Sequence, residues 1–141
     1  MDIENKGIYI LELFAENEFT ITAKKFIDVT FPQGYYYYIG SAQKNLKSRI
    51  GRHFQKEKVI NWHIDHLTTN DSIRIINFFI IEDAEKNVEA EIANNFEIDF
   101  EAQIAVIGFG NSDTKETQSH LFYREEPIPI SKFDVLNDFR K

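Results

Sequence analysis

Apolar positions along the chain follow two different periods. Short runs rich in β-branched and aromatic residues predict strands at residues 7–14, 19–22, 25–31, 34–40 and 72–81. The run at 34–40, GYYYYIG, contains four consecutive tyrosines. Alternation along a strand sends Tyr36 and Tyr38 to one face and the other two tyrosines to the opposite face. We therefore expect this strand to be covered on both faces.

From residue 42 onward, apolar residues recur at intervals of three and four, which predicts helices. The apolar stripes that define three helices are Leu46, Ile50 and Phe54, then Ile60, Ile64 and Leu67, and then Val88, Ile92 and Phe96 within residues 84–96. A terminal helix is expected at residues 130–139, with Ser131 as its candidate N-cap.

The segments between the last elements are less regular. Residues 104–107 suit either a strand or a buried loop, residues 108–113 (GFGNSD) have turn composition, and residues 120–123 predict a last short strand. Together the elements predict a mixed α/β (α+β) fold, with a small, mainly antiparallel sheet flanked by helices. The chain has 141 residues and no repeat or linker, so we expect a single domain over residues 1–141.

Cysteine is absent from the sequence. This excludes disulfides and thiolate metal sites, and it favours a reducing compartment. The first residues do not form a signal peptide, and no apolar run reaches the roughly 18 residues that a membrane span requires. We therefore expect a cytoplasmic protein with no membrane partner.

The formal net charge of −7, taken alone, argues against a nucleic-acid partner. The charge is unevenly distributed, because residues 44–58 carry six basic side chains against Glu57, a local charge of +5. A positive patch on an acidic body can bind phosphate while limiting non-specific adhesion. The candidate nucleic-acid contacts are Lys44, Lys47, Arg52, Lys56 and Lys58. A solvated helix face is the alternative interpretation of this charge run.

Three polar residues lie close to the apolar stripes of the predicted helices. At about 100° per residue, Arg49 and His53 fall on one shoulder of the first stripe, where the core steadies a side chain that reaches out beside the sheet. Glu89 falls on or near the apolar face of the third helix, where a carboxylate is costly unless paired or bound to a metal. The alternatives are ordinary boundary residues for the first pair and, for Glu89, a salt bridge with Arg74.

A second polar cluster lies in the segment NWHIDHL. The spacing of His63, Asp65 and His66 makes a transition-metal site conceivable. Packing around Trp62 and hydrogen-bonded histidines are the stronger interpretation, because the sequence offers no further ligand nearby. The glycines of GFGNSD do not follow phosphate-loop spacing, so no nucleotide cofactor is expected.

In order along the chain, these residues resemble a known family. Gly7-Ile8-Tyr9 and Tyr38-Ile39-Gly40 resemble the paired signature of the GIY-YIG nuclease superfamily, and Arg49, His53 and Glu89 follow in its order and helix placement. Six blocks across residues 7–123 are similar to the bacterial and archaeal family with domain of unknown function 123, also called Uri-superfamily endonucleases. These blocks are GYYYYIGSA, RIGRHFQKEK, NWHIDHL, EAEIA, GFGNSD and SHLFY. The long interval between GIY and YIG implies an extra hairpin between those strands.

The resemblance implies a divalent-metal-dependent endonuclease that hydrolyses phosphodiester bonds, with DNA expected ahead of RNA. Glu89 would be the protein ligand of one Mg²⁺ or Mn²⁺ ion, and Arg49 would hold the scissile phosphate. Tyr9 would be a general base whose phenol pKa is lowered by nearby cations, and Tyr38 would orient phosphate or water. His53 would assist proton transfer or bind a phosphate, and whether it or Tyr9 is the base stays open. Accessory candidates are Ser41, His63 and Asp65.

The chain also departs from the family pattern. Family members often carry cysteines near EAEIA and GFGNSD, where this chain has Ala90, Thr114 and Glu116, and Asn61 stands where histidine is common. A metal site built from those cysteines is therefore excluded. The alternative function is a catalytically inactive nucleic-acid-binding or protein-interaction module on the same scaffold. A small-molecule pocket would rest only on the abundance of tyrosine and phenylalanine, which core packing explains better.

Overall fold

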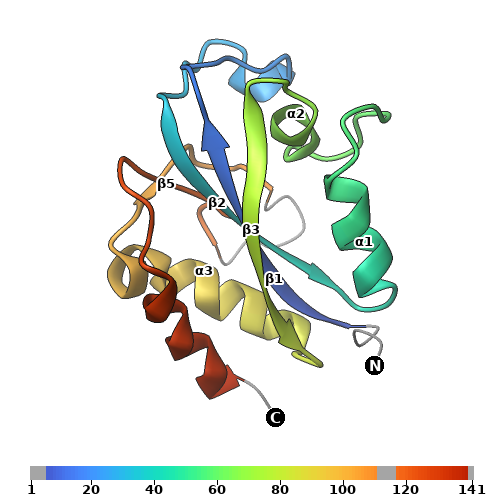
Figure 1. Cartoon of the computed structure of the whole chain (residues 1–141), viewed down its shortest axis with the longest axis vertical. Coiled ribbons are helices and arrows are strands. Elements are labelled where there is room, and N and C mark those ends of the chain that lie inside the picture. Colours follow the sequence, from blue (N-terminus) through green and yellow to red (C-terminus); the bar gives the residue numbers. More distant parts are fainter. Residues whose placement is uncertain (1–5, 111–116, 140–141) are drawn as a thin grey trace.

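β1 (Gly7–Ala15) is an interior strand of the sheet and has a partner on each side. β1 pairs antiparallel with β2 (Gly34–Ala42) on one side and with β3 (Ile73–Glu82) on the other. β2 also pairs with β5 (Leu121–Arg124), and β5 pairs with the short β4 (Gln103–Ile104). The strand order is β3-β1-β2-β5-β4, and every pairing is antiparallel. Figure 1 labels β1, β2, β3 and β5 of this sheet.

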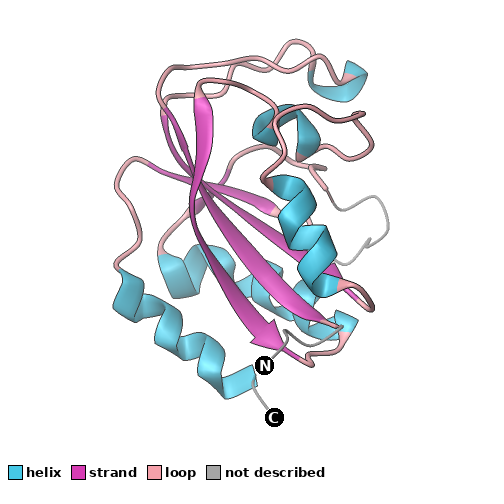
Figure 2. Ribbon diagram, turned by 45° about the vertical axis from the view of Figure 1, so that its right-hand side comes forward, coloured by secondary structure: helices cyan, strands magenta, loops and turns pink. Residues whose placement is uncertain are grey.

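Helices lie on both sides of this sheet (Figure 2). They are α1 (Leu46–His53), α2 (Asp65–Thr68), α3 (Lys86–Phe100) and two 3₁₀ helices, η1 (Lys24–Phe26) and η2 (Ile130–Phe139). The structure is a computed structural model that describes residues 6–110 and 117–139. The predicted fold class, a mainly antiparallel sheet flanked by helices, is confirmed. None of the helices described is long and apolar enough to cross a membrane.

Alternation along β1 divides the core into two layers. Tyr9, Leu11 and Leu13 pack with the apolar residues of α1 and α2 on one face. Ile8 and Ile10 pack with α3 and η2 on the other face. The tyrosines of β2 follow the same rule, since Tyr36 and Tyr38 lie on the α1 face while Tyr35 and Tyr37 lie on the α3 face. The predicted two-sided burial of this strand is thus confirmed.

The two strands predicted at residues 19–22 and 25–31 are not formed. This insertion closes through a single antiparallel bridge between Phe19 and Phe31, and it contains η1 in place of a strand. The rings of Phe19 and Phe31 stack with their centroids 5.0 Å apart, and Phe26 is buried in the same layer. Aromatic packing, rather than a ladder of backbone hydrogen bonds, therefore holds the extra hairpin.

Several predicted boundaries also need correction. α1 ends at His53, so Phe54 lies outside the apolar stripe and is 49% exposed. α2 is a four-residue helix and does not begin near Ile60, whereas α3 continues beyond residue 96 because Phe100 is also buried.

The last segments differ from the prediction in the same way. The strand considered at residues 104–107 is reduced to β4, and η2 begins at Ile130, so Ser131 lies inside the helix and is not its N-cap. Within the predicted turn GFGNSD, Phe109 is fully buried, and Gly108 and Gly110 have positive φ angles. Residues 111–113 lie outside the described part of the chain.

One close approach fixes how β1 and β2 face each other. Tyr9 lies opposite Gly40 in the β1–β2 register. A Cβ atom added at Gly40 would come within 2.5 Å of the Tyr9 ring. Glycine at this position therefore leaves the space in which the Tyr9 side chain lies over β2.

We expect Gly40→Ala to lower the free energy of unfolding by about 1–3 kcal/mol, because the added methyl group overpacks against the Tyr9 ring. Gly51→Ala is the matched control, since a Cβ there meets no atom within 4 Å. This change in α1 should instead stabilise the protein by about 0.5–1 kcal/mol, the helix-propensity difference between glycine and alanine. Urea unfolding of the two variants measures both effects. Equal stability of the two variants would contradict the close approach.

Candidate functional site

A pocket opens where β2 extends beyond its pairing with β5. β5 pairs with β2 only as far as Tyr38, and one further hydrogen bond runs from the Ile39 amide to the His120 carbonyl. Side chains from both faces of the sheet meet at the end of β2, around a cavity of about 180 Å³. Its lining includes six sequence-predicted site residues: Tyr9, Tyr38, Ser41, Arg49, His63 and Glu89. The other lining residues are Asn61, Trp62, Lys86, Gly110 and His120.

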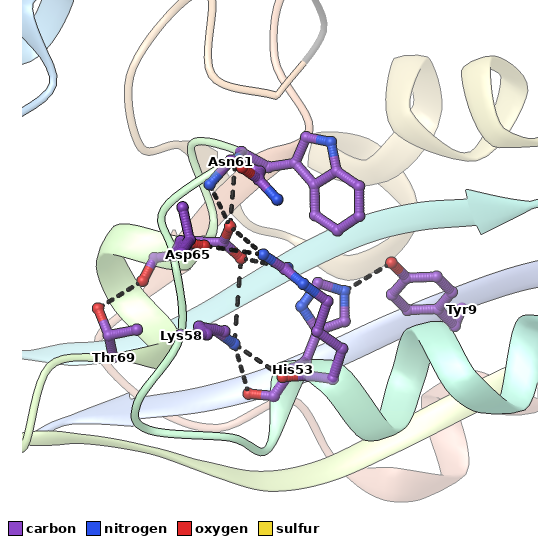
Figure 3. Close-up of polar contacts among 9 residues, drawn as sticks. Tyr9, His53, Lys58, Asn61, Asp65 and Thr69 are labelled. Carbon is purple, nitrogen blue, oxygen red and sulfur yellow. Dashed lines mark hydrogen bonds and ion pairs between the residues drawn. The ribbon is translucent and has the colours of Figure 1, made fainter.

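Tyr9, which lines this pocket, forms a buried pair with His53, which does not. The Tyr9 hydroxyl lies 2.7 Å from His53 Nε2, and the two side chains are 2% and 1% exposed (Figure 3). The other ring nitrogen, His53 Nδ1, is buried without a hydrogen bond. The predicted pair on α1 is therefore split: Arg49 reaches the pocket, while His53 supports Tyr9 from behind.

The pKa of Tyr9 differs from the expectation. Burial raises the pKa of the Tyr9 phenol well above its ordinary value, and the neighbouring Tyr38 raises it further. Arg49 acts in the opposite direction but does not compensate. Burial, together with the charge of Lys58, lowers the pKa of His53 to about 4. At neutral pH both groups are uncharged, so the expected lowering of the Tyr9 pKa is wrong for the protein alone.

Arg49 is held at the mouth of the pocket by two contacts. Its Nη1 donates a hydrogen bond of 3.1 Å to the Ser41 carbonyl oxygen. Its guanidinium carbon lies 4.9 Å from the centroid of the Trp62 ring, a cation–π contact. Both contacts position a fixed positive charge beside Tyr9 and Tyr38, which line the same pocket.

Glu89 enters the pocket from the first turn of α3 and is 6% exposed, so its predicted position near the buried face is confirmed. Its Oε1 accepts a hydrogen bond of 2.9 Å from Ser41 Oγ. Its Oε2 lies 3.2 Å from His120 Nδ1, although that nitrogen is buried and makes no hydrogen bond of adequate geometry. The carboxylate therefore contacts Ser41 and His120, whereas Arg74, the alternative partner, lies over the Phe14 ring.

A buried carboxylate organises the rim of the pocket. Asp65 is 0% exposed and accepts hydrogen bonds of 2.8 and 2.9 Å from the two terminal nitrogens of Arg52 (Figure 3). It also accepts hydrogen bonds from the backbone amides of Asn61 and Trp62, at 2.8 and 3.0 Å. Asp65 thereby ties the segment after α1 to the helix itself.

Three of the five predicted nucleic-acid contacts make structural bonds. Arg52 binds Asp65, and Lys58 donates to the carbonyl oxygens of Arg52 and His53. Lys56 donates to two carbonyl oxygens, those of Asn70 and Ile73. Phosphate contacts by these three side chains would require the bonds to be shared or broken. Lys44 and Lys47, by contrast, are exposed.

The cluster His63, Asp65 and His66 does not form a common ligand set. His63 Nδ1 accepts a hydrogen bond from the Gly110 amide, Asp65 binds Arg52, and His66 Nδ1 lies 3.5 Å from Thr22 Oγ1. Across residues 6–110 and 117–139, no group of three or more His, Asp or Glu side chains is placed to hold a metal ion. The pair formed by Glu89 and His120 is smaller than such a group.

Sequence reasoning missed His120, Trp62 and Lys86 as pocket residues. Lys86 precedes Glu89 by three residues, so both point the same way from α3. His120 directly precedes β5 and is 1% exposed, a buried polar residue beside an apolar strand. The polar residue in the block SHLFY was the available signal for it.

A comparison with known protein families identifies the family of this chain. The family described as Domain of unknown function DUF123 matches residues 8–138. The chain belongs to this family. The match confirms the resemblance noted from the six sequence blocks and covers every pocket residue. No curated protein and no solved structure matches the chain.

The buried His53 should make the stability of this DUF123 protein depend on pH. Its folded pKa of about 4 lies below the ordinary 6.5, so the unfolded chain binds more protons between those values. The stability is therefore complete above pH 6.5 and falls by about 3 kcal/mol as the pH drops toward 4. His53→Gln keeps an acceptor for Tyr9 but cannot titrate. Urea unfolding of both proteins across this window should show a smaller loss in the variant, and equal losses would contradict the assignment.

Proposed function

We propose that this DUF123 protein is a divalent-metal-dependent endonuclease that hydrolyses phosphodiester bonds in nucleic acid. The observation that carries the proposal is the meeting of Tyr9, Tyr38, Arg49 and Glu89 at one pocket. These residues come from two strands and two helices that are far apart in the sequence. Phosphodiester hydrolysis needs an attacking water, a cation against the phosphate and a route for the proton, and the pocket has a candidate group for each need.

Arg49 and Lys86 are the candidate phosphate-binding groups. Both line the pocket, Arg49 from α1 and Lys86 from the first turn of α3. The guanidinium group offers several N–H donors to phosphate oxygens, and the ammonium group adds a second positive charge. Tyr38, from the strand between them, would orient the phosphate or the attacking water through its hydroxyl.

Glu89 and His120 fit a divalent ion. Glu89 Oε2 and His120 Nδ1 are separated by 3.2 Å, so these two side chains would hold the ion together. A buried nitrogen without a hydrogen bond is also consistent with a missing partner at this place. When bound, Mg²⁺ or Mn²⁺ supplies positive charge against the phosphate and polarises the attacking water.

Proton transfer would pass through the pair of Tyr9 and His53. Tyr9 accepts a proton from the attacking water as its own phenol proton moves to His53 Nε2, 2.7 Å away. Burial disfavours the resulting imidazolium, as the lowered pKa of His53 indicates. A phosphate bound at Arg49 carries the negative charge that offsets this cost. Tyr9 therefore acts as a base without a phenolate in the resting protein.

Glu89→Gln tests the metal ligand and should lower cleavage by a factor of about 10² or more, since a metal site contributes several kcal/mol to the transition state. The amide retains an acceptor for Ser41 Oγ, so the fold should persist in thermal melts. Glu91→Gln, an exposed change on the same helix, is the matched control. Cleavage of labelled DNA and RNA forms, with and without Mn²⁺, is the measurement. Metal-dependent binding without cleavage by the wild type would favour the non-catalytic alternative.

Reversing Lys44 and Lys47 to glutamate tests the phosphate footprint, because both side chains are exposed at the start of α1. Affinity should fall similarly for all sequences, since phosphate contacts carry little sequence information. The slope of log affinity against log salt should shrink by about one per lost contact. Lys24→Glu, on η1, controls for the change in net charge that each single reversal makes. Equal salt slopes in the variant and the wild type would place the footprint elsewhere.

A further inference from the structure

Trp62 is the only tryptophan of the chain, and 39% of its surface is exposed. Among the exposed large apolar side chains of the described residues, it is the one that lines the pocket. Phe54 and Phe78, which are also exposed, pack edge-on against each other outside this pocket. A solvent-accessible ring in the wall of a polar pocket offers a surface on which an aromatic or apolar group of a ligand can stack.

The position of Trp62 is fixed by the structure around it. Its amide donates a hydrogen bond of 3.0 Å to the Asp65 carboxylate, and its carbonyl accepts one of 3.0 Å from the Asp65 amide. The guanidinium carbons of Arg49 and Arg52 lie 4.9 and 4.5 Å from its ring centroid. Both arginines come from α1, so the indole is positioned against a rigid helix and beside the proposed phosphate-binding group.

The charge of the protein gives a second, independent argument. The net charge is −7, and within the basic segment Arg52, Lys56 and Lys58 already make structural bonds. The affinity that arises from phosphate contacts grows with the number of cations that release counterions. A protein with few such cations needs a further source of affinity for nucleic acid. Stacking on an aromatic ring supplies it without added charge.

We propose that Trp62 stacks on an unpaired nucleobase next to the phosphate held by Arg49, so that the substrate is single-stranded or locally unpaired nucleic acid. This inference rests on the proposed function. A base inside a duplex is already stacked on its neighbours, so a ring at the edge of the pocket reaches only a base that has left the stack. Arg49 and Trp62 together then hold one nucleotide by its phosphate and its base.

The emission of the single tryptophan reports directly on this contact. The Glu89→Gln protein, in the presence of a chelator, is titrated with three short probes at one salt concentration. These are oligothymidylate, an abasic deoxyribose-phosphate chain of the same length, and a blunt duplex that contains the same oligothymidylate. Oligothymidylate should quench Trp62 emission, whereas the abasic chain and the duplex should not. Quenching by the duplex as strong as by the single strand overturns the proposal, as does the absence of quenching by all three.

Trp62→Ala in the same background separates stacking from charge. Because this variant has no tryptophan, binding is followed by the anisotropy of labelled probes. Its affinity for oligothymidylate should fall about 5- to 150-fold, the range for loss of one stacked base. Its affinity for the abasic chain should not change, because that chain has no base to stack on Trp62 and keeps the same phosphate contacts. Trp62→Phe should bind oligothymidylate within about threefold of the parent, since stacking tolerates any aromatic ring. Phe54→Ala, which removes an exposed ring outside the pocket, should have no effect.

The two proposals fail in different ways. Equal weakening of both probes by Trp62→Ala would mean that the ring acts only by holding Arg49 and Arg52, and this result overturns the stacking inference. If Trp62→Ala, in a protein that keeps Glu89, cleaves nucleic acid with Mn²⁺ as fast as the wild type does, the stacking inference is overturned but the nuclease proposal stays in place. Quenching that depends on the base, without cleavage of any nucleic acid, supports stacking on Trp62 but overturns the nuclease proposal.

Discussion

Burial of β1 on both faces is the constraint on which the rest of the structure depends. β1 lies between β2 and β3, and both core layers include its side chains. Two polar groups on this strand, the Tyr9 hydroxyl and the Glu12 carboxylate, are removed from water and need partners. Tyr9 finds His53 on α1, and Glu12 accepts a hydrogen bond of 2.5 Å from the Tyr37 hydroxyl, which in turn accepts one from the Ile128 amide. The same requirement thus attaches α1 on one face and the segment before η2 on the other.

The site follows from where the sheet stops. β5 is only four residues long, so β2 extends past it, and the two faces that β1 keeps apart come together at that end. Tyr9 and Tyr38 arrive from the α1 face, whereas Ser41 has the opposite orientation and reaches Glu89 on α3. A short strand therefore allows two tyrosines, an arginine and a carboxylate from different layers to share a pocket of about 180 Å³.

The sequence predicted the parts of this site that depend on local geometry. Strand alternation placed the tyrosines of β2, and the helical angle placed Glu89 at the buried edge of α3, where it is 6% exposed. The hydrogen bonds made by Arg52, Lys56 and Lys58, by contrast, depend on tertiary contacts that local geometry does not predict. A buried carboxylate recruits whichever cation can reach it, and Asp65 recruited Arg52 across 13 residues. The predicted lowering of the Tyr9 pKa was wrong for a related reason, because the rise caused by desolvation is larger than the lowering caused by the nearby charge of Arg49.

Asn61 and Ala90, two of the departures from the family pattern, leave the contacts around the pocket in place. At residue 61 the hydrogen bond to Asp65 is made by the backbone amide, which donates to the Asp65 carboxylate over 2.8 Å. Every residue except proline supplies that amide, so asparagine in place of histidine leaves the Asp65 network intact. Ala90 follows Glu89 on α3, and Glu89 contacts Ser41 and His120, neither of which depends on a cysteine at residue 90. Alanine at residue 90 therefore brings no thiolate to α3 beside Glu89, while the Glu89 carboxylate, its partners and the Trp62 ring line or border the pocket in which the proposed chemistry takes place.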